Sequence, residues 1–188
     1  MTTLETTDLQ QARQYFCHTR NRVAEATTRL SDAQWSFKPA PDRWSIAEIL
    51  EHMVIVQERV LERLRDQFPK APAPPPDRDN RQIDAIVFER IPERSPRVTA
   101  PPVIEPTGQW TLPDTMDRLF RNYERLTAFV ESTPDLREHI LESPPLRVVT
   151  NGAFDTMDGY QWALTAAAHD ERHVRQILEV KTDPNYPA

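Results

Sequence analysis

The sequence predicts an all-α protein: a four-helix bundle, up-down-down-up, with a long Pro-rich crossover between helices two and three. Three observations lead to this prediction. Four segments repeat apolar residues at helical spacing, no segment alternates apolar and polar residues as a strand would, and ten of the 42 residues in 69–110 are proline. Four long amphipathic helices with one long connection are typical of a bundle. We take residues 1–188 as a single domain, with 69–110 as its crossover.

The first two helices are predicted on the N-terminal side of the crossover. The first covers about residues 8–30, and the second begins after Ser45 and continues to about Phe68. Ser45 and Glu48 form the S-x-x-E capping box, which marks a helix start because each side chain accepts a hydrogen bond from the other residue's backbone. Trp44 precedes this cap and is expected to pack on the helix as a hydrophobic staple.

The other two long helices are predicted after the crossover. The third starts at Thr111, a suitable cap followed by Pro113 in the first turn, and ends before Pro134. The fourth runs from near Thr156 to about Val180. Shorter helical pieces are predicted at 31–37, 80–90 and 135–141.

Composition argues against several classes of function. A net charge of −6 and a pI of about 5.4 make the chain a poor binder of nucleic-acid phosphates, and it has neither a GxGxxG nor a GxxxxGK loop. No apolar run of 18 residues and no signal-peptide pattern occur, so no membrane partner is expected. The single cysteine, Cys17, cannot form an internal disulfide, and this suits a cytoplasmic location.

The first candidate functional residues are His169 and His173, which lie one turn apart on the predicted fourth helix. Trp162 and Ile177 extend the same stripe, which indicates that both histidines face inward. An unsatisfied buried imidazole costs roughly 1–3 kcal/mol, so the two rings need partners, and one shared metal ion would satisfy both. The alternatives are a solvated helix face, or buried rings satisfied by hydrogen bonds without a metal.

A third ligand is expected on a facing helix, and His52 lies on the buried side of the second helix. It follows the Ser45 cap by seven residues, about 10 Å at 1.5 Å per residue, and His173 precedes the predicted helix end by a similar length. The heights match only if these helices are antiparallel neighbours, which we therefore predict. Three neutral imidazoles with an open fourth position are typical of a catalytic site for one divalent ion, Zn²⁺, Ni²⁺ or Fe²⁺.

Other polar residues near the histidines are assigned by their position on the helices. Glu48 and Gln176 are candidates to hold the second nitrogen of a metal-bound ring, or to line the cavity. The alternatives are a capping role for Glu48 and a surface position for Gln176. Asp170 and Glu171 point off the stripe by about 100° and 200°, so we interpret them as surface charges. Trp162 is a candidate wall of the pocket.

Two segments resemble the signatures of the DinB-like (DinB/YfiT) superfamily: LSDAQWSFKPAPDRWSIAEILEHM (30–53) and GYQWALTAAAHDERHVRQI (159–177). The order and spacing of the four helices are also similar, over nearly the whole chain. The resemblance implies an up-down-down-up bundle in which His52, His169 and His173 bind one divalent metal, with water completing the site. It also implies a homodimer. Some relatives transfer low-molecular-weight thiols such as bacillithiol or mycothiol onto electrophiles, or isomerise substrates with a thiol, and many have no known activity.

Three functions remain open at this point. The preferred one is a metal-dependent enzyme that transfers a low-molecular-weight thiol to a small electrophile, because a metal lowers the pKa of a bound thiol. The sequence has no evident basic cluster for the carboxylates of such a thiol, which counts against it. The second is a metal-dependent hydrolase, for which only Glu48 is available as an acid or base. The third is a non-enzymatic bundle that binds metal or a small ligand.

Overall fold

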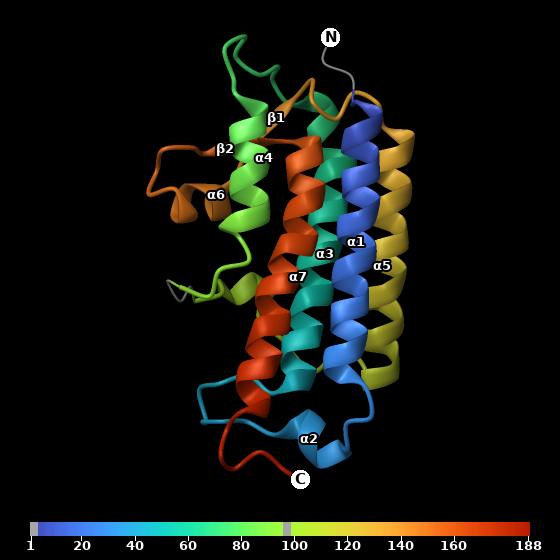
Figure 1. Cartoon of the computed structure of the whole chain (residues 1–188), viewed down its shortest axis with the longest axis vertical. Helices are drawn as coiled ribbons and strands as arrows, with labels where there is room; N and C mark the ends of the chain where they lie inside the picture. The colour runs from blue at the N-terminus through green and yellow to red at the C-terminus, as the bar shows by residue number, and fades with distance from the viewer. Residues whose placement is uncertain (1–3, 96–98) are drawn as a thin grey trace.

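The computed structural model describes residues 4–95 and 99–188, and four long helices lie side by side in it (Figure 1). They are α1 (Thr6–Thr27), α3 (Ile46–Asp66), α5 (Leu112–Ser132) and α7 (Gly159–Lys181). In Figure 1, α1 and α7 run from top to bottom, whereas α3 and α5 run from bottom to top. The predicted all-α class is confirmed. Residues 1–3 and 96–98, which belong to the predicted domain and crossover, lie outside the described residues.

Side-chain caps explain where two of these helices begin. The Ser45 hydroxyl accepts from the Glu48 N–H at 3.2 Å, and the Glu48 carboxylate accepts from the Ser45 N–H at 2.7 Å, as the capping-box pattern predicted. Thr111 caps α5 by accepting from the Asp114 N–H at 3.3 Å. Each cap satisfies backbone donors that have no partner within the helix.

The predicted start of the fourth helix at Thr156 is wrong. Residues Thr156–Asp158 form strand β2, and α7 begins at Gly159. Asp158 is the cap: its carboxylate accepts from the Gln161 N–H at 2.7 Å, and the Gln161 side chain accepts from the Asp158 N–H at 3.0 Å. The apolar periodicity of α7 continues into the strand, so periodicity alone could not separate the two.

The predicted short helix at 135–141 and the predicted lack of strands are also wrong. β1 (Ile140–Glu142) pairs antiparallel with β2, with Leu141 opposite Met157, and α6 (Pro144–Val149) lies between the strands in sequence. Strands of three residues are too short to show a repeat of two. Tertiary pairing determines this segment, since the Gly159 N–H also donates to the Leu136 carbonyl at 2.7 Å.

Shorter elements complete the fold. The helices predicted at 31–37 and 80–90 are present as α2 (Asp32–Ser36) and α4 (Asn80–Glu89). Two 3₁₀ turns, η1 (Phe68–Lys70) and η2 (Pro102–Ile104), lie in the Pro-rich crossover. α4 packs on the bundle through Ile83 and Val87, both fully buried. Within the described residues, no helix is both long and apolar enough to cross a bilayer.

α3 and α7 are antiparallel neighbours, as the register of the histidines predicted. Arg63, near the end of α3, lies 4.7 Å from the ring of Trp162, near the start of α7. His52, in the first half of α3, instead contacts His169, in the second half of α7. A run of small buried residues on α7 (Ala163, Ala166, Ala167, Ala168) allows its neighbours to approach closely.

A buried ion cluster fixes the end of the bundle at which α7 begins. The guanidinium of Arg137 is paired with Asp84 and Asp158, each at 2.9 Å, and with Asp8 at 3.4 Å. It also lies 4.4 Å from the ring of Tyr160. These partners belong to α1, α4, the α7 cap and α7 itself, so one cation connects four parts of the fold.

We expect Arg137→Met to lower the free energy of unfolding by roughly 3–5 kcal/mol, because three buried carboxylates lose their shared cation. Urea unfolding at neutral pH measures the change. Arg121→Met is the matched control: the Arg121 side chain is 63% exposed, against 4% for Arg137, and its pair with Asp117 lies on the surface. The control should change stability by less than about 1 kcal/mol. Equal effects of both substitutions would contradict a stabilising role for the cluster.

Candidate metal centre

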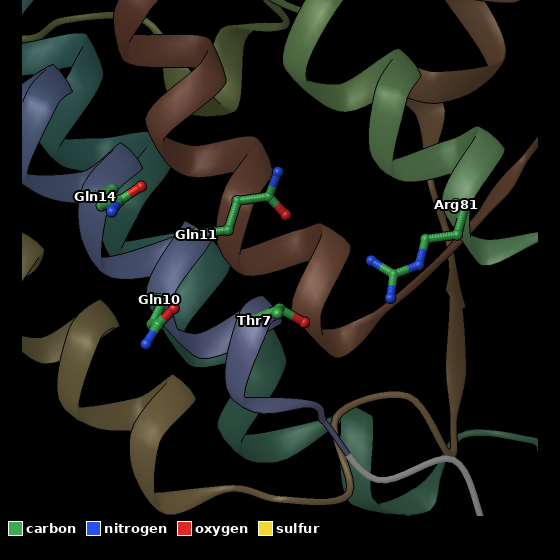
Figure 2. Close-up of a pocket in the computed structure, with 5 residues that line it drawn as sticks. All are labelled: Thr7, Gln10, Gln11, Gln14 and Arg81. Atoms are coloured by element: carbon green, nitrogen blue, oxygen red, sulfur yellow. The ribbon is translucent and has the colours of Figure 1, made fainter.

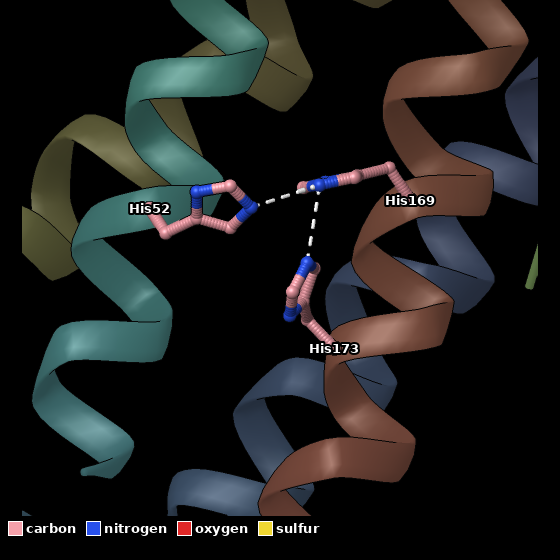
Figure 3. Close-up of side chains that lie close together, drawn as sticks. All are labelled: His52, His169 and His173. Atoms are coloured by element: carbon pink, nitrogen blue, oxygen red, sulfur yellow. Dashed lines mark hydrogen bonds between the residues drawn. The ribbon is translucent and has the colours of Figure 1, made fainter. Parts of the chain in front are cut away.

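Three histidines converge between α3 and α7 (Figure 3). His52 comes from α3, and His169 and His173 come from successive turns of α7. The Nε2 atom of His169 lies 3.1 Å from the Nε2 of His52 and 3.1 Å from the Nε2 of His173. The ligand nitrogens of all three lie within 4.8 Å of one another. The structure therefore brings together the three residues that the sequence singled out.

Burial keeps the three rings neutral. Burial, followed by the neighbouring His169, lowers the pKa of His52 to about 3. Burial and the positive charge of Arg172 lower the pKa of His169 to about 3 as well. Burial and the other two histidines lower the pKa of His173 well below its usual range. At neutral pH each imidazole therefore has one N–H and one lone pair.

A backbone carbonyl holds the second nitrogen of His52. Its Nδ1 lies 2.7 Å from the oxygen of Ile104, in η2 of the crossover. A carbonyl can only accept, so Nδ1 donates and the lone pair lies on Nε2, which faces the other histidines. The residue before His52, Glu51, holds the same part of the crossover: its carboxylate accepts from the backbone N–H groups of Thr107, Gly108 and Gln109 at 2.9–3.2 Å.

Gln176 holds the second nitrogen of His173. Its Oε1 lies 2.8 Å from Nδ1 of His173, and it also accepts from Arg94 Nη1 at 3.2 Å. Because arginine can only donate, this contact identifies the Gln176 atom as the acceptor oxygen. His173 therefore donates through Nδ1, and its Nε2 lone pair also points to the centre. Gln176 is therefore buried and hydrogen-bonded to the His173 ring, and it does not lie on the surface.

Asp170 and Glu171 are buried, so their interpretation as surface charges is wrong. Asp170 Oδ2 accepts from Gln57 Nε2 at 2.6 Å and from the Tyr123 hydroxyl at 2.7 Å. Burial raises the pKa of Asp170 to about 8, although these two hydrogen bonds act in the opposite direction. Glu171 is paired with Arg22 at 3.1 Å. α7 packs against α1, α3 and α5 together, so a side chain that points off one apolar stripe still points into the protein.

Two further assignments change with the structure. Glu48 is committed to the Ser45 cap and to Lys38, at 2.9 Å, so its carboxylate serves the start of α3. Trp162 lies against Arg63, toward the other end of α7, and is not a wall of the histidine site. Trp44 has that position instead, because its ring centroid lies 4.8 Å from that of His52 and 6.5 Å from that of His173.

The donor set fits a divalent metal ion. Three neutral nitrogen ligands suit Zn²⁺, Ni²⁺ and Fe²⁺, and a tetrahedral ion with N–metal bonds of 2.0–2.1 Å holds its nitrogens about 3.4 Å apart. The two Nε2–Nε2 distances of 3.1 Å are close to this value. The lone pairs of His52 and His173 both face this point, and two lone pairs repel unless a proton or a cation lies between them. The three histidines could thus hold one ion.

An open polar hollow of about 400 Å³ lies toward the other end of the bundle (Figure 2). Side chains of α1 line it together with Arg81 of α4, whose guanidinium is already paired with Glu5 and Asp8. The rest of its lining consists of a hydroxyl and three amides (Thr7, Gln10, Gln11, Gln14). This lining lacks the imidazoles and carboxylates that bind metal ions.

Comparison with known proteins adds a family to this geometry. A family model described as the DinB superfamily matches residues 15–177. An uncharacterized protein, YuaE, of Bacillus subtilis (strain 168) is 28% identical to this chain over 153 residues, which cover 81% of this chain and 86% of that protein. No solved structure matches the chain. The family match includes all three histidines.

We expect the rings of His52, His169 and His173 to remain neutral in the metal-free protein between pH 8 and pH 5. An unfolded histidine takes up its proton near pH 6.5, whereas burial delays protonation of the folded His52 and His169 to about pH 3. The stability that these neutral rings contribute is therefore complete above about pH 6.5 and is lost as the pH falls from there toward 3. Histidine ¹⁵N chemical shifts, recorded with chelator present, measure the protonation of each ring. A midpoint near pH 6.5 for these rings would contradict their burial.

Proposed function

The chain belongs to the DinB superfamily, and from that membership and the histidine geometry we propose that it binds one divalent metal ion through His52, His169 and His173. One observation carries the proposal: the Nδ1 atoms of His52 and His173 both donate to acceptors, so both rings must direct an Nε2 lone pair at the same point. Zn²⁺, Ni²⁺ and Fe²⁺ all fit three imidazoles.

The activity that we propose is transfer of a low-molecular-weight thiol to a small electrophile. An ion held by three neutral ligands keeps most of its positive charge and lowers the pKa of a thiol or water beside it, which supplies a nucleophile at neutral pH. In the transfer, the sulfur–carbon bond forms, the leaving group departs with its electron pair, and the thiol proton passes to solvent. Trp44 and η2 would form the walls that position the two reactants.

The charges around the site favour an anionic nucleophile. Arg94 is two hydrogen bonds from the His173 ring, through Gln176, and Arg172 is close enough to His169 to lower its pKa. These two arginines are 78 residues apart, so the sequence alone shows no basic cluster. Glu179 offsets part of the positive charge of Arg94. A thiolate gains from positive potential around it.

A metal-dependent hydrolase is the second candidate, and the structure gives it less support. Hydrolysis of an ester or amide needs a proton donor for the leaving group, and Glu48 was the residue available for this role. Its carboxylate is instead committed to the Ser45 cap and Lys38. A non-enzymatic metal-binding or ligand-binding bundle needs only the three histidines, and the activity measurements below distinguish it from an enzyme.

Three further features belong to the proposal. We take the four long helices as the up-down-down-up bundle that family membership implies. We propose a homodimer, which light scattering coupled to size-exclusion chromatography would detect as twice the 21.8 kDa chain mass. We place the protein in the cytoplasm, with a small-molecule substrate and neither nucleic acid nor membrane as partner.

Metal analysis by mass spectrometry tests the site directly. We expect about one ion per chain in the untagged parent protein and at most about a tenth of that in the His52→Ala/His169→Ala/His173→Ala variant. His18→Ala is the matched control, since His18 is exposed and lies outside the cluster, and it should retain the metal. A parent that stays empty after incubation with zinc, nickel and iron would exclude a metal site and both enzyme candidates.

Activity assays then separate the candidates. The metal-loaded parent should conjugate physiological thiols to a chromogenic electrophile, and a chelator should slow the reaction by at least about 100-fold, because a catalytic metal contributes several kcal/mol. Conjugation that persists in the triple-histidine variant would contradict this activity. Hydrolysis of an ester panel that depends on both metal and His52 would favour the hydrolase, and metal binding without either activity would favour the non-enzymatic bundle.

A further inference from the structure

We propose that Asp170 is a positioning residue of the histidine centre: its Oδ1 accepts the Nδ1–H of His169 and so keeps the Nε2 lone pair of that ring directed at His52 and His173. The tautomer of His169 is a property of the metal-free protein and can be measured there. The consequence for metal affinity rests on the function proposed above.

The first argument is that two neighbouring buried atoms both need a partner. Nδ1 of His169 and Oδ1 of Asp170 are buried atoms without a hydrogen-bond partner at normal distance, and they lie 3.5 Å from each other. An unsatisfied buried polar atom is destabilising, and a small rotation of the His169 ring that closes this gap would satisfy both atoms at once.

The second argument is that the carboxylate is held in place by other helices. Its Oδ2 accepts from Gln57 of α3 and from Tyr123 of α5, both at normal hydrogen-bond distance. Asp170 and Gln57 are fully buried and Tyr123 nearly so. Both donors bind the same oxygen, so the other oxygen, Oδ1, is the one left to face His169. Residues of two other helices thus set the orientation of this carboxylate.

The third argument is that, among the three rings, His169 is the one whose Nδ1 has no other hydrogen-bond acceptor in the described residues. His52 donates to the Ile104 carbonyl, and His173 donates to Gln176. Each contact fixes the proton on Nδ1 and the lone pair on Nε2. The same state of His169 requires an acceptor beside its Nδ1, and Asp170 Oδ1 is the atom that lies there. If Asp170 served only to connect the helices, the tautomer of the His169 ring would not depend on Asp170.

The isosteric Asp170→Asn variant tests this role, because it reverses the polarity of one atom. Gln57 Nε2 and the Tyr123 hydroxyl both donate, so the amide of Asn must present its oxygen to them and its NH₂ group to His169. Nδ1 of His169 then has to accept, which moves the ring proton to Nε2 and removes the lone pair from the centre. We expect metal affinity to fall about 10–100-fold.

The measurement is made on the metal-free protein. Long-range ¹H–¹⁵N correlation spectra report the tautomer of each histidine, and we expect the Nδ1–H form of His169 in the parent and the Nε2–H form in Asp170→Asn. Zn²⁺ affinity is measured in parallel by competition with a chromogenic chelator. Asp117→Asn is the matched control: it makes the same substitution at an exposed carboxylate of α5 outside the histidine cluster, so the His169 tautomer should persist and Zn²⁺ affinity should change less than about threefold.

Each outcome bears on the proposal. An Nε2–H tautomer of His169 in the parent overturns it without any variant, so it remains testable if Asp170→Asn does not fold. An unchanged tautomer and unchanged Zn²⁺ affinity in a folded Asp170→Asn protein also overturn it, and leave the metal site itself standing. If the tautomers change as expected but the parent binds no Zn²⁺, the role of Asp170 at His169 holds and the proposed function fails.

Discussion

Three imidazole rings share one small space inside a helix bundle, and two of them are fixed by hydrogen bonds so that a lone pair points into it. This constraint explains most of the structure around them. Burial keeps the rings neutral, and a neutral buried ring needs an acceptor for its remaining N–H. The acceptors come from different places: a crossover carbonyl for His52 and a side chain on the same helix for His173. The crossover and α7 therefore both contribute to holding this one group of side chains.

The two ends of the bundle have different structural roles. At the end where α7 begins, Arg137 and its carboxylates hold α1, α4 and the α7 cap together. The histidines lie farther along α7, beside the first half of α3. Because α7 is capped and clamped at its start, its later turns are held at a fixed rotation relative to α3. Two rings one turn apart can then meet a third ring from across the interface, which a loosely held helix would not achieve.

Part of this arrangement could be predicted from the sequence. Helical periodicity placed His169 and His173 on one face, and the distance of His52 from the Ser45 cap predicted the antiparallel α3–α7 pair. Asp170 was assigned to the surface because its angle was measured from one apolar stripe, although α7 is surrounded by other helices. The run of small residues from Ala166 to Ala168 was a signal of burial on several sides. The strands were not predicted because three residues are too few for a periodic pattern. Arg94 was not predicted as a neighbour of the site because 82 residues separate it from Gln176 in the sequence.

The acceptor that fixes His52 belongs to the main chain of Ile104, and every amino acid provides that oxygen. A substitution at this position therefore leaves the group intact, and only a change in the path of the loop removes it. Glu51 anchors that path through three backbone N–H groups, which every residue except proline can provide. The crossover can thus diverge widely in amino-acid sequence among descendants of this protein and still support the same histidine. Selection at this contact acts on the length and geometry of the loop. A search for invariant residues in the crossover would therefore not detect the contact.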